Sequence, residues 1–255
     1  MSKINIKEIR ERYLSSKEKE KEFKWTYCVR RPISYCVAIP FLRLGVSATS
    51  VTILWLIVAA IGCAILASGT YVNMVIGAAL LEIAVILDCV DGHIARFTRT
   101  TLTGEILDRW VGEILLVSSM FATGIGLSNS SDPMIVGLIG FEIDRVIFVY
   151  LGLFGAFAAL FTWTVRLHWR KIALKGSLGD YEHDHFMRKS KITFIMGNLF
   201  HYSGALTMVL VISAALHFLD VALILICVNY GAYLLATMGR IITKARSLDS
   251  GNIDK

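Results

Sequence analysis

The chain has 255 residues, of which 55% are hydrophobic, and it carries a net charge of +6 at pH 7. Its mean hydropathy of +0.62 excludes a soluble domain of ordinary composition. We expect no nucleic-acid partner, because a basic rim beside anionic lipid accounts for the positive charge. The five cysteines include no C-x-x-C pair, so neither a disulfide nor a zinc site is expected.

The first 45 residues form a polar segment rich in Lys and Glu. It has no short apolar core followed by a small-residue cleavage site, so we predict no signal peptide. We expect residues 1–45 to form one or two amphipathic helices that lie on the inner leaflet as a cytoplasmic N-terminal segment. The part that reads RERYLSSKEKEKEF fits a solvated helix equally well.

Apolar stretches of about 20 residues, the length of helix that crosses ~30 Å of hydrocarbon, follow one another along the rest of the chain. They predict an all-α integral membrane bundle of six transmembrane helices, preceded by the juxtamembrane amphipathic helix. We expect the membrane domain over residues 46–245 and a cytoplasmic tail over residues 246–255. The spans are expected at residues 48–69, 71–96, 102–127, 143–166, 192–216 and 219–241, and residues 134–142 are apolar without a clear assignment.

The 26 Lys and Arg side chains lie almost entirely on one side of this topology. Twenty-five fall in the N-terminal segment, the turn between spans two and three, residues 166–191 and the C-terminus, and only Arg145 falls on the other side. Positively charged loops stay on the cytoplasmic side of a membrane. We therefore expect a multi-pass protein with both termini in the cytoplasm, in the inner membrane of a bacterium.

Three carboxylates occur near the cytoplasmic ends of spans two and three. Asp88 lies ~25 Å along a helix that begins near Tyr71, and Asp91 shares its face three residues later. Asp108, about two turns into the next span, can face both. A charge at the centre of a membrane helix costs about 2.5–3.5 kcal/mol, and less near the edge, so such a cluster indicates function. An all-oxygen site of this kind suits Mg²⁺, Mn²⁺ or Ca²⁺.

The residues after Asp91 are suited to a flat, anionic ligand. Gly92 and Ala95 lie one helical turn apart and have almost no side chain, so they either leave a groove for a ligand or allow close helix packing. Arg96 then offers a guanidinium fork that fits phosphate.

This segment reads Asp88-x-x-Asp91-Gly92-x-x-Ala95-Arg96, followed after seven residues by Gly104-x-x-x-Asp108. It resembles the signature of the CDP-alcohol phosphotransferase (phosphatidyltransferase) family. The six-span layout, the RRPIS stretch before span one and the LGVSATSVT stretch leading into it are similar to the family as well.

The resemblance implies a membrane transferase of phospholipid or related head-group synthesis. Such an enzyme moves a substituted phosphate group from a CDP-linked donor, often CDP-diacylglycerol, to an alcohol acceptor and releases CMP. It implies a homodimer and divalent metal, and two ions of Mg²⁺ or Mn²⁺ suit the pyrophosphate chemistry. By resemblance the metal ligands are Asp88, Asp91 and Asp108, and the residues bordering the CDP are Gly92, Ala95, Arg96 and Gly104.

One position departs from the family pattern. The family has a last Asp four residues after the one that matches Asp108, as metal ligand and base for the acceptor hydroxyl, but this chain has Gly112 there. Glu113 is the candidate catalytic residue, although a regular helix turns it ~140° away from Asp108 and a π-bulge would be needed to bring it round. Glu105, a proton acceptor from elsewhere, the substrate phosphate, or loss of ordinary activity are the alternatives.

The remaining candidate substrate-binding residues are Thr52, Arg109, Lys189 and Lys191. Thr52, at the start of span one, either lies near the phosphate or bonds its own backbone. The three basic residues either bind an anionic acceptor or anchor the cytoplasmic loops.

Two other classes remain open. A cation transporter explains buried Asp residues but leaves Gly92, Ala95 and Arg96 without a role. A catalytically altered relative that binds CDP without ordinary turnover is suggested by Gly112. Short motifs do not identify the acceptor alcohol.

Overall fold

The computed structural model describes residues 6–7, 9–11, 23–98, 101–131, 144–175 and 191–249. Within these ranges every regular element is a helix. The elements are the π-helix η2 (Thr26–Arg30), which continues directly into α2 (Arg31–Arg43), and then α3 (Ala48–Ala67), α4 (Tyr71–Phe97), α5 (Leu102–Asn129), α7 (Ile147–Lys175), α8 (Lys191–Phe200), α9 (Leu206–Ala215) and α10 (Leu219–Asp249).

Five of these helices, α3, α4, α5, α7 and α10, are long and apolar enough to cross a membrane. The chain is therefore a multi-pass membrane protein, and it is all-helical over the described residues. Four of the five begin at the predicted residue. The fourth span was expected to begin at residue 143, but α7 begins at Ile147, after a turn at residues 145–146.

The predicted span over residues 192–216 is not one continuous helix. It consists of two apolar helices of ten residues each, α8 and α9, separated by a turn over residues 201–205. The Ala205 amide donates to the Asn198 carbonyl at 2.7 Å, and a Cβ on Gly204 would collide with the same carbonyl. Glycine at this position therefore permits the break between α8 and α9. Average hydropathy does not detect this break, because both helices are apolar.

Small residues set the close packing of the long helices. A Cβ on Gly77 of α4 would lie 2.5 Å from the Leu66 nitrogen and 2.7 Å from the Gly62 oxygen, both on α3. Gly124 of α5 is similarly pressed against the Phe148 carbonyl of α7. With no hydrophobic driving force between helices in lipid, such backbone approach supplies the packing energy.

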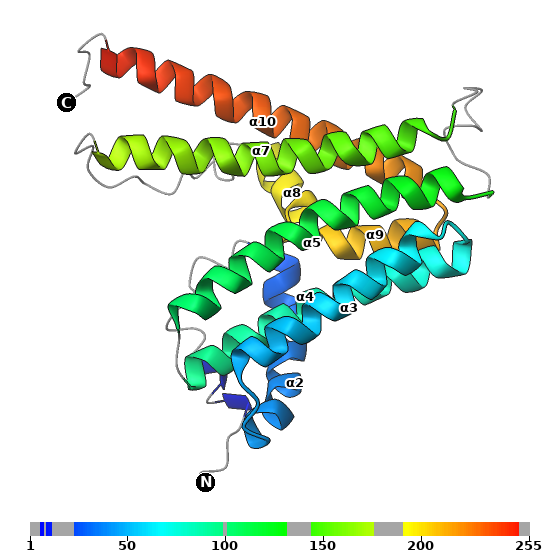
Figure 1. The fold of residues 1–255 in the computed structure, drawn as a ribbon, viewed down its shortest axis with the longest axis vertical. Helices are drawn as coiled ribbons and strands as arrows, with labels where there is room; N and C mark the ends of the chain where they lie inside the picture. Colours follow the sequence, from blue (N-terminus) through cyan, green and yellow to red (C-terminus); the bar gives the residue numbers. More distant parts are fainter. Residues whose placement is uncertain are drawn as a thin grey trace.

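The helices form two layers that diverge toward one end. α3, α4 and α5 run side by side, and α7 and α10 lie together beyond α5, with their C-terminal halves extending away from it (Figure 1). The C-terminal end of α4 and the N-terminal end of α5 lie together at the lower left of this view. These two helix ends carry the predicted acidic residues.

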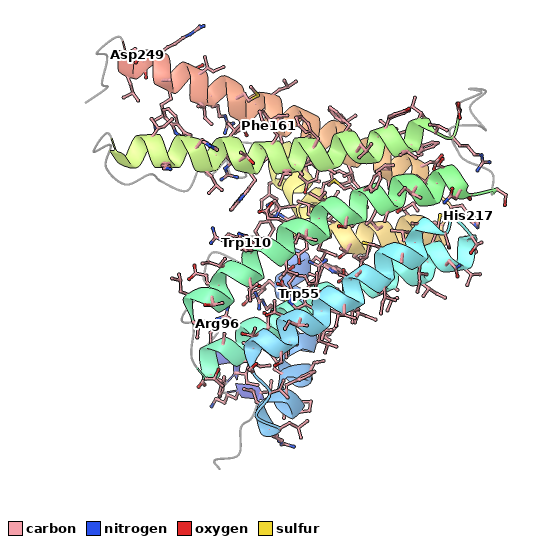
Figure 2. The ribbon with its side chains drawn as sticks, viewed as in Figure 1. Trp55, Arg96, Trp110, Phe161, His217 and Asp249 are labelled. Carbon is pink, nitrogen blue, oxygen red and sulfur yellow. The ribbon has the colours of Figure 1, made fainter. Side chains whose placement is uncertain are left out.

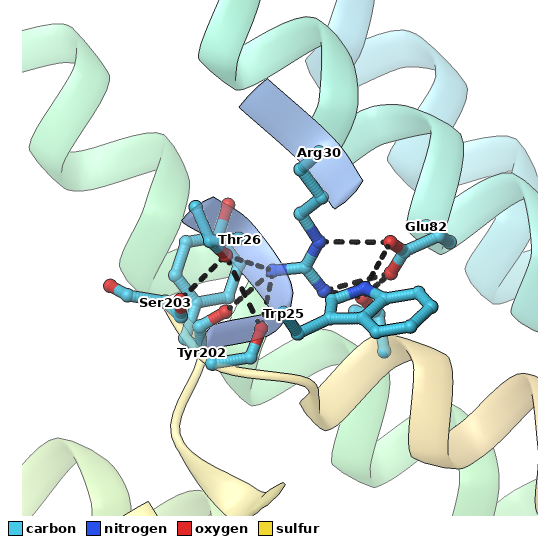
Figure 3. A network of polar contacts seen from close by, with 8 residues as sticks. Trp25, Thr26, Arg30, Glu82, Tyr202 and Ser203 are labelled. Atoms are coloured by element: carbon cyan, nitrogen blue, oxygen red, sulfur yellow. Dashed lines mark hydrogen bonds and ion pairs between the residues drawn. The ribbon is translucent and has the colours of Figure 1, made fainter. Parts of the chain in front are cut away.

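The N-terminal segment enters the bundle. η2 and α2 pack against α4, and the Arg30 side chain is completely buried. Its guanidinium donates two hydrogen bonds of 2.8 Å to the Glu82 carboxylate on α4 and one of 2.7 Å to the Gly204 carbonyl in the α8–α9 turn (Figure 3). Glu82 lies ~16 Å along α4 at 1.5 Å per residue, so this part of the segment is docked well inside the helix bundle.

Candidate active site

Asp88 and Asp91 on the last turns of α4 and Asp108 on the second turn of α5 converge. One oxygen of each carboxylate lies within 4.8 Å of the other two. Asp91 is buried, Asp88 is half-buried and Asp108 is exposed, so the cluster is open on the α5 side. Carboxylates at this spacing repel one another unless a cation or protons lie between them. The donor set is all oxygen and partly dehydrated, which fits the hard divalent ions Mg²⁺ and Mn²⁺.

The first turns of α3 hold Asp91 in place. The Thr52 hydroxyl and the Trp55 indole N–H both donate to Asp91 Oδ2, at 2.8 and 2.9 Å. Both side chains are buried. Both hydrogen bonds go to the same oxygen, so Thr52 and Trp55 fix the orientation of the carboxylate without occupying Oδ1.

Span one therefore contributes directly to the acidic cluster. The Thr52 hydroxyl also lies 3.1 Å from the Ala48 carbonyl, so it touches both its own helix and the acidic cluster. Trp55 was not among the predicted site residues. The signal was its spacing, since it follows Thr52 by three residues and therefore shares its helix face.

The residues expected to border the CDP lie next to the cluster. Arg96 folds back over Gly92, and a Cβ at Gly92 would lie 3.3 Å from the Arg96 guanidinium. Ala95 is half-buried beside them, and Figure 2 shows Arg96 at the end of α4. Gly104 lies in the first turn of α5. Its N–H donates at 3.1 Å to the hydroxyl of Thr101, which is the N-cap residue of the helix.

The other face of α5 carries Arg109 and Glu113. Arg109 lies over the Trp163 ring of α7, 5.6 Å from its centroid, and forms a 4.0 Å ion pair with Glu105. Glu113 is half-buried and interacts electrostatically with Arg109 and with Tyr230 of α10. α5 is a regular α-helix from Leu102 to Asn129, without the π-bulge that would turn Glu113 toward Asp108.

The basic loop before α8 is only partly described. Lys191 is the exposed first residue of α8, whereas Lys189 lies outside the described residues.

A family comparison agrees with this geometry. No curated protein matches the chain. The family model for CDP-alcohol phosphatidyltransferase matches residues 45–226, from the turn before α3 into α10, and so includes all three Asp residues of the cluster. Because this match spans well over half of the 255 residues, the chain belongs to the CDP-alcohol phosphatidyltransferase family.

Proposed function

We propose that this protein transfers a substituted phosphate group from CDP-diacylglycerol to an alcohol acceptor at the cytoplasmic membrane surface, releasing CMP. Family membership supports a CDP-alcohol donor, an alcohol acceptor and a transferase reaction. The observation that carries the proposal is the convergence of Asp88, Asp91 and Asp108 at one end of an apolar bundle. A lipid-tailed donor explains why these acidic groups lie at the edge of the hydrocarbon.

The three Asp carboxylates would hold Mg²⁺ or Mn²⁺, two ions in our proposal, whose charge neutralises the pyrophosphate and the departing CMP. Thr52 and Trp55 fix the rotamer of Asp91, so that carboxylate is oriented before substrate binds. Arg96 supplies a guanidinium for phosphate beside Gly92, and Ala95 and Gly104 border the nucleotide.

The acceptor side involves the basic residues and Glu113. Arg109, Lys189 and Lys191 bind a phosphate of the acceptor, if it carries one, by charge-assisted hydrogen bonds. Glu113 is our proposed acceptor of the proton from the acceptor hydroxyl. Because it lies on the face of α5 turned to α7 and α10, the acceptor alcohol would approach the acidic cluster from that side.

We further propose six membrane passes, with α8 and α9 together forming the broken fifth one. The distribution of Lys and Arg supports cytoplasmic termini, and we propose a bacterial inner membrane as the location. The membrane domain would span residues 46–245 of a homodimer, between the N-terminal segment 1–45 and the tail 246–255.

The test is release of CMP from labelled CDP-diacylglycerol by purified protein with Mn²⁺. The acceptors are glycerol 3-phosphate, inositol 1-phosphate, inositol and serine, each added separately. Asp91→Asn should abolish release, because the amide keeps an acceptor oxygen for Thr52 and Trp55 but loses the charge. Asp144→Asn is the matched control, since Asp144 is exposed beside the start of α7 and its amide oxygen can still accept from the Val146 N–H.

The outcomes separate the classes. Mn²⁺-dependent CMP release that is lost only in Asp91→Asn supports the transferase. Retention of CDP without turnover against all acceptors would indicate a catalytically altered binding protein. Binding of Mn²⁺ with no affinity for cytidine nucleotides would indicate a cation carrier and refute the proposal.

A further inference from the structure

The space left by Gly112 is covered by a tyrosine ring. Gly112 follows Asp108 by four residues and shares its helix face. A Cβ at Gly112 would lie 3.9 Å from Cε1 of Tyr202, which is an ordinary van der Waals contact. Tyr202 comes from the turn between α8 and α9, so a residue distant in sequence lies at the position where the family pattern has its last carboxylate.

The backbone around Tyr202 is held by the buried Arg30 network. Arg30 donates to the carbonyls of Tyr202 and Gly204 at 3.3 and 2.7 Å, and Thr26 donates to the Ser203 carbonyl at 2.7 Å (Figure 3). Arg30 is at the same time bound to Glu82 of α4. The turn that carries Tyr202 is therefore fixed to the helix that carries Asp88 and Asp91.

The Tyr202 hydroxyl is buried and has no hydrogen-bond partner among the described residues. The ring contacts the face of α5 that carries Asp108 and Gly112, and Asp88 and Asp108 are close enough to act on the hydroxyl electrostatically. Glu113 has its electrostatic partners, Arg109 and Tyr230, on the other side of α5. A buried hydroxyl without a partner costs stability that a phenylalanine of the same shape would not. A ligand bound at the carboxylates would satisfy it.

We propose that the Tyr202 hydroxyl contacts the substrate, donating a hydrogen bond to an oxygen of the transferred phosphate. It does so from the place of the carboxylate that Gly112 replaces. This inference rests on the proposed function. A neutral phenol donates a hydrogen bond to the phosphate directly, whereas a carboxylate at the same place would act through a bound cation or as a base.

The test compares Tyr202→Phe with unaltered protein under the CMP-release conditions above, using the acceptor that supports turnover. Phenylalanine keeps the ring and removes only the oxygen. We expect kcat to fall about 100-fold, the usual effect of removing one donor to a developing oxyanion. Thermal stability should stay at or above the level of the unaltered protein, because no protein hydrogen bond is lost. Mn²⁺-dependent binding of CMP, which lacks the transferred phosphate, should also be unchanged. Tyr150→Phe, at a 65% exposed tyrosine of α7, is the matched control.

A second pair of variants tests the place of the hydroxyl. Gly112→Asp in the Tyr202→Ala background restores a carboxylate in the cleared space, and we expect more activity than in Tyr202→Ala alone. Equal activity in these two variants, or an unchanged kcat in Tyr202→Phe, overturns the inference and leaves the proposed function standing. Absence of CMP release from unaltered protein overturns the proposed function itself.

Discussion

Arg30 is the residue whose replacement should most strongly destabilise the bundle. The five N–H donors of its buried guanidinium lie within hydrogen-bond distance of six oxygens, from Glu82, Thr207, Thr26 and the carbonyls of Tyr202 and Gly204. Arg30→Met keeps a long apolar stem but leaves the Glu82 carboxylate buried and without its cation.

The magnitude follows from the burial of both partners. Removing one partner of a buried ion pair costs about 3–5 kcal/mol. For a chain of this size each kcal/mol lowers Tm by roughly 2–4 °C, so we expect a fall of about 6–20 °C. The double variant Arg30→Met/Glu82→Leu removes both charges and should recover much of this loss, because no buried charge is then unpaired.

The assay is thermal unfolding of the purified protein in one detergent at fixed lipid content, followed by tryptophan fluorescence. Arg246→Met, at an exposed residue in the last turn of α10, is the control and should change stability by no more than about 0.5 kcal/mol. The assignment of Arg30 and Glu82 as a coupled buried pair is refuted by either of two results. One is that Arg30→Met unfolds at the same temperature as Arg246→Met, and the other is that the double variant is no more stable than Arg30→Met.

Three other substitutions test the site and the packing. Trp55→Phe removes a donor to Asp91 and should weaken Mn²⁺ affinity about 10–100-fold in titration calorimetry; an unchanged affinity would show that the indole does not orient the carboxylate. Gly77→Ala forces the backbones of α3 and α4 apart and should cost about 1–3 kcal/mol in thermal unfolding, whereas Gly239→Ala, with nothing within 4 Å of its Cβ, should not. Glu113→Gln should reduce CMP release strongly, and full activity in that variant would reject Glu113 as the base.

The sequence by itself determined the features that depend on neighbouring residues. The starts of α3, α4, α5 and α10 match the predicted starts, because crossing the hydrocarbon requires a continuous apolar run of fixed length. The convergence of Asp88 and Asp91 followed from helical spacing, and that of Asp108 from the short turn between α4 and α5. The charge of the loops also predicts an orientation by a local rule, and this stays a prediction.

The tertiary structure decided which distant residues complete the site. Arg30 and Glu82 are 52 residues apart, Trp55 reaches Asp91 from 36 residues away, and Tyr202 covers Gly112 from a turn that hydropathy placed inside a span. No hydrophobic periodicity or local motif indicates such pairs. Their members come from separate helices, and they meet only where the folded bundle brings those helices together around a dehydrated space. A buried donor and acceptor must find each other there, and which ones do so depends on the packing of the whole bundle.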